Sequence, residues 1–203
     1  MSPNLIIIDN LKKESFSEAK DSSIEIRDDN KIVIGKLIPV GKWTLKNDFI
    51  IDQIYSWRKR AMRYFLTRFK PSFELTFNYI KNISIEDKNR IFFLIYDEEE
   101  NLIGHIGLAD IKDTNAELDN MMRGNHGGHK DLIYYAELAI LSWSFNVLNI
   151  ENINLRVFSF NRGTIQIHSR SGFTDRSKIY LYKKVENDIT THQEVRKENS
   201  NIE

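Results

Sequence analysis

The stretch Asn161–Phe173, which reads NRGTIQIHSRSGF, decides the fold of this 203-residue chain. It follows Ile153–Phe160, an apolar run whose β-branched and aromatic residues predict a strand. Arg162–Ser171 then predicts a short helix, which Asn161 can cap at its start. The positions that mark the stretch are Asn161, Thr164, His168, Gly172 and Phe173, where successive positions lie three, four, four and one residues apart. A spaced set of this kind carries more information than any one of its residues.

A glycine-rich junction lies one strand and one helix upstream. It reads RGNHGGHKD over Arg123–Asp131, and a long helix is predicted after it, from about Asp131 to Leu148. Glycines allow a close approach to the backbone, and the first turn of a helix offers unpaired N–H groups with a partial positive charge. The junction therefore suits a pyrophosphate, although a tight turn that only starts a helix would need the same glycines. The cations that could assist binding are Arg123, Lys130, His126 and His129.

The earlier part of the chain predicts further strands and helices. Amphipathic helices are expected over Asp48–Phe69, ending before Pro71, and over Glu74–Ile83. The acidic turn Asp97–Asn101 separates two apolar runs and predicts a hairpin. The expected strands are Lys31–Val40, Arg90–Tyr96, Leu102–Ile111, Ala116–Arg123, Ile153–Phe160 and Ile179–Lys184. This order of elements is mixed α/β.

Composition limits the classes of protein. A hydrophobic content of 41% supports one core, so we expect one domain at 31–185, an arm at 1–30 that is partly ordered or flexible, and a charged tail at 186–203. Lys plus Arg and Asp plus Glu both total 29, so nucleic acid is not the expected partner. The chain has no cysteine, which excludes disulfides and thiolate sites and fits the cytoplasm. No histidine spacing indicates a metal site, and no apolar run approaches the roughly 20 residues of a membrane span.

Four segments together resemble the GNAT acyl-CoA acetyltransferases, whose closing motif runs N-x-x-A-x-x-x-Y-x-x-x-G-F. They are IGHIGLADI at 103–111, AELDNMMRG at 116–124, YYAELAILSWSF at 134–145 and the closing NRGTIQIHSRSGF. The resemblance extends from about Lys36 to Lys184 and is greatest to bacterial members of surface amino-sugar pathways. It implies a mostly antiparallel sheet with one splayed strand, flanked by helices. It also implies acetyl-CoA as acyl donor, an amine acceptor, and a homodimer as one possible assembly.

The resemblance also implies which residues bind the donor. The strand before the glycine junction would splay from its neighbour and expose its backbone to the pantetheine arm, with Met121 and Met122 at that contact. A backbone N–H at this point would stabilise the oxyanion. Asn161 matches the family asparagine that contacts the same arm. The full implied set is Met121, Met122, Arg123, Gly124, Gly127, Gly128, Lys130 and Asn161.

Acetyl transfer to an amine needs a base for the ammonium proton and an acid for the thiolate. Glu117 and Asp119 alternate by two, so they share one face of a strand. We hypothesise that Glu117, or Asp119 through a water, removes the proton, although solvated strand charges would look the same. His168 stands at the family's tyrosine position, where an imidazolium can act as the acid, although a lone histidine is more often structural. His105 is a further candidate, for which a core role is favoured.

The acceptor is indicated by a basic and aromatic stretch, Trp57–Phe73. Its helical periodicity favours a solvated basic face over a buried aromatic face. In the family, this region lines the acceptor pocket, which makes a phosphate-bearing acceptor such as a nucleotide-linked amino sugar attractive. Three alternatives stay open: a protein N-terminal or ribosomal-protein acetyltransferase, a catalytically degenerate acyl-CoA-binding module and, last, a nucleic-acid binder.

Overall fold

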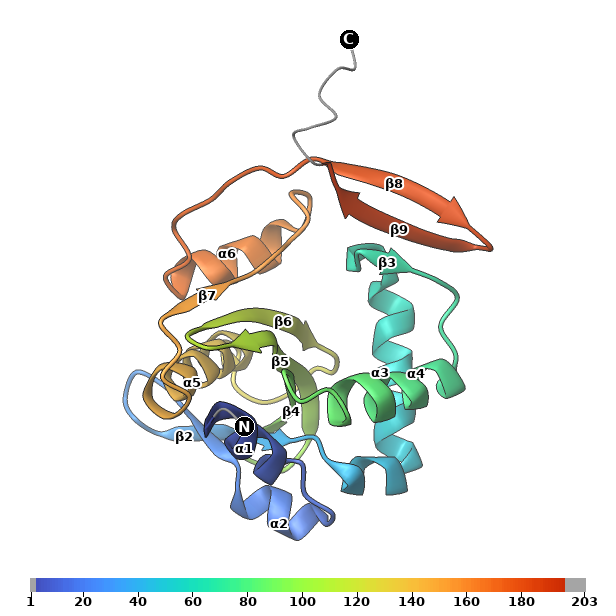
Figure 1. Ribbon diagram of the computed structural model, residues 1–203. Coiled ribbons are helices and arrows are strands. Elements are labelled where there is room, and N and C mark those ends of the chain that lie inside the picture. Colours follow the sequence, from blue (N-terminus) through green and yellow to red (C-terminus); the bar gives the residue numbers. More distant parts are fainter. Residues whose placement is uncertain (1–2, 196–203) are drawn as a thin grey trace.

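A six-stranded sheet forms the centre of the computed structural model, which describes residues 3–195 (Figure 1). Its strand order is β1-β2-β4-β5-β6-β7, and all neighbours are antiparallel except β6 and β7. The strands are β1 Ile24–Arg27, β2 Val33–Pro39, β4 Ile91–Asp97, β5 Leu102–Lys112, β6 Asn115–Arg123 and β7 Asn152–Asn154. A smaller sheet, of order β3-β9-β8, contains β3 Thr67–Arg68, β8 Leu181–Glu186 and β9 Ile189–Glu194.

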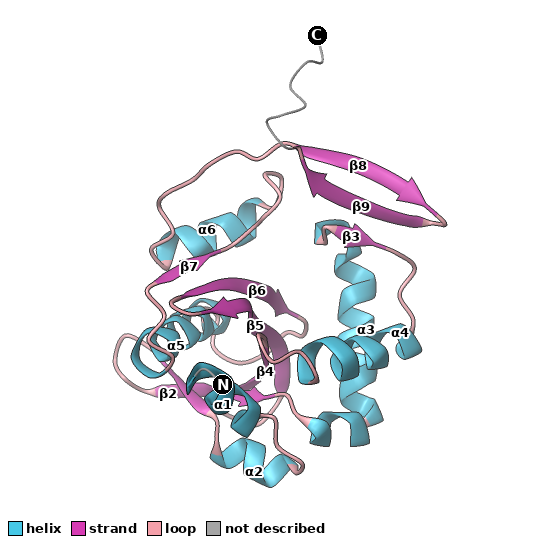
Figure 2. Ribbon diagram, in the orientation of Figure 1, coloured by secondary structure: helices cyan, strands magenta, loops and turns pink. Residues whose placement is uncertain are grey.

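Helices cover both faces of the central sheet, which gives the core two layers (Figure 2). Alternation along β4 explains the layers, because Phe93 packs into one cluster with α5 and Phe92 packs into the other with α3. The helices are α1 Pro3–Leu11, α2 Phe16–Asp21, α3 Asp48–Ala61, α4 Phe73–Tyr79, α5 Leu132–Val147 and α6 Arg162–Arg170, with short turns η1 Lys42–Lys46, η2 Met62–Tyr64 and η3 Ile80–Ile85. This is the predicted mixed α/β architecture. No helix within residues 3–195 has the length and apolar character to cross a membrane.

Both ends of the chain differ from the expectation. Leu5–Ile8, in the segment expected as an arm, lies in helix α1, and Ile8 is fully buried in the core. β1 pairs with β2 and buries Ile26, so the segment expected as an arm contributes to the sheet. At the other end, the boundary expected at residue 185 falls inside the β8–β9 hairpin. The remainder of the expected charged tail, 196–203, lies outside the described residues.

The splayed strand is present at the β6–β7 pair. Parallel pairing covers only three residue pairs, from Asn115–Asn152 to Glu117–Asn154. Beyond it the chain leaves the sheet and rises towards α6, whereas β6 continues to Arg123 beside β5 (Figure 1). The strand expected to reach Phe160 therefore ends at Asn154, because no neighbour pairs with residues 155–160. The edge of β6 from 118 to 123 has no strand on this side, and we call this opening the fork.

Candidate active site

An ion pair connects the two sides of the fork at its base. The Glu117 carboxylate of β6 accepts hydrogen bonds from Nε and Nη2 of Arg156, both at 3.0 Å. Arg156 belongs to the segment that leaves the sheet, and its Nη1 also lies 3.7 Å from Glu194 of β9. The Glu117 side chain is only 16% exposed. The predicted base is therefore held in a two-pronged contact that joins β6 to the departing chain.

The second predicted carboxylate lies in a polar cluster at a bulge in β6. Asp119 accepts a hydrogen bond from Nη1 of Arg90 at 2.5 Å, and its side chain is 35% exposed. Asn120 adopts a positive φ of 54°, and its Nδ2 donates to Asp119 at 2.7 Å and to the Tyr79 hydroxyl at 2.8 Å. Glu117 and Asp119 therefore each have their own arginine. Neither Arg90 nor Tyr79 carried a functional signal in the sequence.

His105 lies behind this bulge as a core residue. It is 1% exposed, and its Nδ1 lies 2.5 Å from the carbonyl oxygen of Asn120. Burial lowers the pKa of His105 to about 4, so the ring is neutral at neutral pH and Nδ1 donates the hydrogen. This agrees with the favoured core interpretation.

Helix α3 packs against the glycine junction. A Cβ on Gly124 would lie 2.1 Å from the Trp57 ring, so only glycine fits there. Trp57 Nε1 donates to Asn125 Oδ1 at 3.1 Å, and Arg60 Nη2 donates to the Gly124 carbonyl at 2.7 Å. The contribution of Gly124 is thus packing against α3. In the sequence, Trp57 and Arg60 belong to the amphipathic stretch Trp57–Phe73 that was assigned to the acceptor, and nothing there linked them to the glycine junction.

Five consecutive N–H groups of the junction have no partner within residues 3–195. The N–H groups of Gly124 and Asn125 both bond the carbonyl of Ile103, at 2.8 and 2.9 Å. From His126 to Lys130, in contrast, no backbone N–H donates to a described residue. Because exposed consecutive N–H groups at a helix start form an anion-binding nest, this run fits a pyrophosphate. Of the predicted donor-binding residues, it contains Gly127, Gly128 and Lys130.

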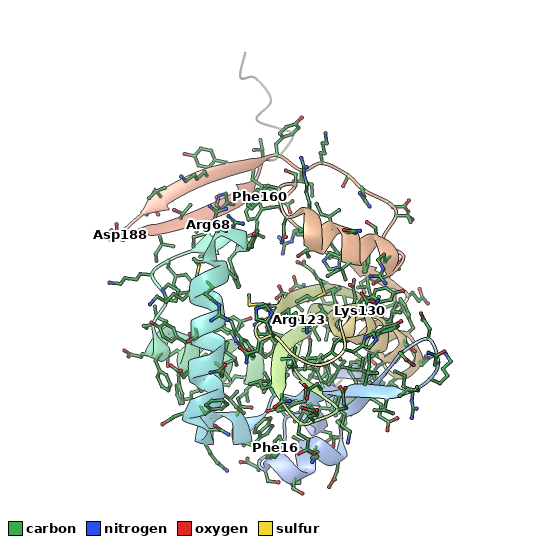
Figure 3. The ribbon with its side chains drawn as sticks, turned by 180° about the vertical axis from the view of Figure 1, so that it is seen from behind. Phe16, Arg68, Arg123, Lys130, Phe160 and Asp188 are labelled. Carbon is green, nitrogen blue, oxygen red and sulfur yellow. The ribbon has the colours of Figure 1, made fainter. Side chains whose placement is uncertain are left out.

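Two of these glycines adopt left-handed backbone conformations, which turn the run towards the start of α5. Gly127 has φ 116° and Gly128 has φ 62°, and a Cβ on Gly128 would lie 2.8 Å from the Cβ of Asp97. Arg123, at the end of β6, donates to the carbonyl of Gly127, and Lys130 lies at the other end of the run (Figure 3). The guanidinium and the ammonium are both exposed and add positive charge to the nest.

The remaining predicted donor contacts lie on either side of the fork. Met121 packs against the hydrophobic cluster that contains α5, and Met122 packs against the cluster on the other face of the sheet, which contains α3. Their side chains therefore diverge, and their backbone lies at the open edge of β6. Asn161 precedes α6, and its half-buried side chain makes no hydrogen bond to a described residue. The structure thus places Met121 and Met122 on β6 and the nest in the loop that follows this strand, with Asn161 on the opposite side of the fork.

His168 occupies a buried site between α6 and α5. It is 7% exposed, and its Nδ1 lies 2.7 Å from Oε1 of Glu137, which is fully buried. Phe173 packs against the ring with its edge. The sequence analysis missed Glu137, although one signal was present: it is the only charged residue of α5.

Arg58, near the end of α3, is buried and forms no ion pair with any residue from 3 to 195. It is 8% exposed, and its guanidinium carbon lies 4.3 Å from the centre of the Tyr79 ring, with Phe65 and Phe69 at 5.8 and 5.6 Å. Nε and Nη1 are enclosed and have no hydrogen-bond acceptor. Burial lowers the pKa of Arg58, but a guanidinium stays protonated in proteins. A positive charge thus lies among the rings of Phe65, Phe69 and Tyr79, near enough to Asp119 for the two charges to attract each other.

A large cavity lies outside the fork and reaches the glycine junction at Asn125 and His126. Its volume is about 890 Å³. The lining comes from α2, β2, η1, the start of α3 and the β4–β5 turn, and includes Phe16, Trp43, Phe49, Tyr96, Glu98 and His126. The cavity is therefore a space distinct from the fork. No group of three or more potential metal ligands occurs within residues 3–195.

Comparisons with known proteins give the same fold. The model of the acetyltransferase (GNAT) domain family matches residues 45–190. The acetyltransferase PseH of Campylobacter jejuni is 22% identical over 149 residues, which are 72% of this chain and 92% of that protein. Spermidine N-acetyltransferase of Vibrio cholerae, solved with CoA and spermine, is similar with a TM-score of 0.57 at 20% identity, over 77% of this chain and 94% of that one. A dodecameric structure of the same enzyme has a TM-score of 0.52 at 22% identity, over 72% and 88%.

Proposed function

Because this chain belongs to the GNAT acetyltransferase family and uses acetyl-CoA as acyl donor, we propose that it acetylates the primary amine of an anionic acceptor, with a nucleotide-linked amino sugar as the expected class. The observation that carries the donor site is the nest of five unpartnered N–H groups, 126–130, at the start of α5. The fork lies next to it along β6, so a pyrophosphate at the nest leaves the pantetheine arm free to follow the open strand edge.

Arg58 supports the anionic character of the acceptor. A buried cation with two enclosed nitrogens that lack acceptors is stabilised by a nearby anion and destabilised by a second cation. Burial lowers the pKa of Arg58, and the negative charge of Asp119 opposes this effect. Asp119 is also the nearby carboxylate that can receive an amine. An acceptor with an amine at one end and a phosphate at the other therefore suits this cluster. A polyamine, which is positive along its whole length, suits it poorly.

The chemistry asks each residue for a separate task. Glu117 and Asp119 are both held by arginines, so water carries the ammonium proton out, with Asp119 as the more exposed of the two carboxylates. Backbone N–H groups at the open edge of β6, near Met121 and Met122, stabilise the charge that develops on the thioester oxygen. His168 supplies the proton for the departing thiolate. The chain has no cysteine, which suits direct transfer without an acyl-enzyme.

Mass spectrometry of the products tests this function. Purified protein would be incubated with acetyl-CoA and, separately, with UDP-glucosamine, spermidine and a peptide with a free basic N-terminus. We expect an acetylated UDP-amino sugar and little acetylated spermidine. Acetylation of the peptide alone would indicate the protein-acetyltransferase alternative. Tight binding of acetyl-CoA with no acetylated amine would indicate a binding module.

The Arg58→Met variant tests the acceptor assignment. Methionine fills the aromatic cage without charge, so KM for UDP-glucosamine should rise roughly tenfold, the loss of one charge-assisted contact. Thr67→Ser, an exposed substitution on the neighbouring surface, is the control and should leave KM for UDP-glucosamine unchanged. An unchanged KM in Arg58→Met with normal thermal stability would contradict the assignment.

A further inference from the structure

Glu137 has an environment that is unusual for a carboxylate. It is the only charged residue among the 16 residues of α5, and none of its surface is exposed. Removing a carboxylate from water costs several kcal/mol unless a partner compensates it. Oε1 lies 2.7 Å from Nδ1 of His168, whereas the enclosed Oε2 has no partner within residues 3–195. His168 is therefore the group that stabilises the charge on Glu137.

The charges on neighbouring elements are directed elsewhere. Several are already paired: Arg170 with Asp131, Glu117 with Arg156, Asp119 with Arg90, and Glu25 with Arg27. The others form no ion pair or hydrogen bond with Glu137 or His168: Lys36, Asp110, Lys112, Arg123 and Arg162. Apolar residues of α5 and the sheet make up the surrounding cluster. The carboxylate and the imidazole thus act on each other with little competition.

The hydrogen bond decides which nitrogen of His168 is available. A carboxylate accepts, so Nδ1 carries the hydrogen and Nε2 is left for a second proton. Nε2 bonds to no described residue and is not one of the enclosed unpartnered atoms, in contrast to Nε2 of His105. His168 also occupies the tyrosine position of the closing motif, at the C-terminal part of the helix that follows the fork. The free nitrogen is thus on the residue from which a proton donor is expected.

We propose that Glu137 is a positioning residue for acetyl transfer, which holds His168 by Nδ1 so that Nε2 presents a proton to the leaving thiolate. The inference rests on the proposed function. In the transfer, the amine nitrogen forms a bond to the acetyl carbon and the carbon–sulfur bond breaks. The thiolate takes the proton from Nε2, the amine loses its proton to water, and solvent returns a proton to Nε2. The buried carboxylate accepts the hydrogen bond from Nδ1 throughout, and its position favours the imidazolium.

The pH profile of the Glu137→Gln variant tests the proposal. Glutamine keeps the shape and can still accept from Nδ1, but it removes the negative charge that stabilises imidazolium. With UDP-glucosamine as acceptor, kcat should fall about tenfold at pH 8 and less at pH 6, with KM for acetyl-CoA within about twofold of wild type. The alkaline limb of the profile should move to lower pH. Glu151→Gln, which changes an exposed carboxylate just after α5, is the matched control.

A double variant separates positioning from folding. His168→Tyr installs a hydroxyl at the motif position, which needs no carboxylate behind it. Glu137→Gln should therefore have no further effect on kcat in the His168→Tyr background, although it lowers kcat in the wild-type background. Thermal unfolding of each variant shows whether it folds. Nitrogen-15 NMR of the imidazole provides a reading independent of any acceptor, and wild type should show a hydrogen on Nδ1 of His168.

The outcomes distinguish the two claims. If wild type acetylates an amine and Glu137→Gln has an unchanged pH profile, the role of Glu137 is wrong and the function stands. If His168 shows its hydrogen on Nε2 alone, the proposed orientation is wrong. If wild type binds acetyl-CoA and acetylates no amine, both the function and the role of Glu137 are wrong.

Discussion

His105 links the folding of the protein to pH at the level of a single residue. Burial lowers its pKa to about 4, below the value of about 6.5 of an exposed histidine. Between these values the unfolded chain binds more protons than the folded one, so stability falls as the pH decreases from about 6.5 to about 4. Between pH 7 and pH 5 this residue should reduce the free energy of unfolding by about 2 kcal/mol.

Urea unfolding of His105→Gln measures this effect. The variant should be less stable than wild type at pH 7, because its neighbours are packed for an imidazole, but it should lose less stability on going to pH 5. An equal loss in both proteins would contradict a buried neutral histidine.

Gly124 offers a steric prediction. An alanine Cβ would lie 2.1 Å from the Trp57 ring, which is buried and held by its bond to Asn125, so the ring cannot move aside cheaply. Gly124→Ala should lose about 1–3 kcal/mol of stability and weaken acetyl-CoA binding in calorimetry.

Gly163 provides the control for this substitution. Its Cβ would meet open space inside a helix, so Gly163→Ala should gain about 0.5–1 kcal/mol and bind acetyl-CoA normally. A Gly124→Ala variant with wild-type stability would contradict the packing of the junction.

At this scale the sequence identified residues whose role depends on local chemistry. The spacing of Gly127 and Gly128 before a helix predicts an anion site, and both glycines have the positive φ that such a loop requires; the anion site itself stays a prediction. Glu137 was not predicted, and Arg58 was expected only as one arginine of the basic and aromatic stretch Trp57–Phe73. The significance of both comes from burial without compensation, which depends on tertiary packing. Glu117 was recognised as a candidate base, but its arginine lies 39 residues away and could not be inferred.

At the scale of elements, the nest should bind the donor through charge as well as through N–H groups. Lys130 is exposed at the end of the nest, so Lys130→Gln should raise KM for acetyl-CoA roughly threefold to tenfold with little change in kcat, and should make KM less sensitive to salt. Steady-state kinetics at 50 and 300 mM salt give KM and kcat at each salt concentration, and hence the salt dependence of KM. Lys88→Gln, at another exposed lysine, should match wild type. An unaltered KM in Lys130→Gln would place the pyrophosphate elsewhere.

The ion pair at the base of the fork gives a second prediction for an element. If Glu117 acts by joining β6 to the departing chain, Glu117→Gln and Arg156→Gln should both lower kcat, and the two kcat values should lie within about twofold of each other. Both variants remove the same partly exposed ion pair, which contributes about 0.2–1 kcal/mol. Their pH profiles should keep the wild-type shape. Loss of activity in Glu117→Gln alone would instead identify Glu117 as the base.

Hydrophobic periodicity predicted the central elements well and the edges poorly. Strands β2, β4, β5 and β6 and helix α5 lie close to their predicted ranges, because they are long and buried. The helical stretch predicted over Asp48–Phe69 is wrong at its end: α3 stops at Ala61, and Thr67–Arg68 forms strand β3, which pairs with β9. The strand expected to reach Phe160 ends at Asn154, since a strand needs a neighbour as well as β propensity. The first 30 residues were expected as an arm, because a short apolar run there stands beside a long polar stretch. Helix α1 instead packs on the sheet through Ile8, and β1 joins the sheet and buries Ile26.

At the scale of the whole molecule, the smaller sheet is attached by aromatic contacts beside the fork. The Arg68 guanidinium carbon lies 5.2 Å from the centre of the Phe158 ring, and the Tyr64 and Phe160 rings lie 5.9 Å apart (Figure 3). The segment 155–160 therefore connects the departing chain to the end of α3. Both sides of the fork are thus tied to α3, which also braces the glycine junction and carries Arg58.

Hydrogen–deuterium exchange with and without CoA tests the central claim, that the fork and the nest hold the acyl donor. We predict that CoA slows exchange in peptides covering 118–123, 126–130 and 155–161. Peptides from the large cavity, covering 33–38, 43–50 and 96–100, should be unchanged. Protection of the cavity peptides, with none in the fork or the nest, would contradict the account.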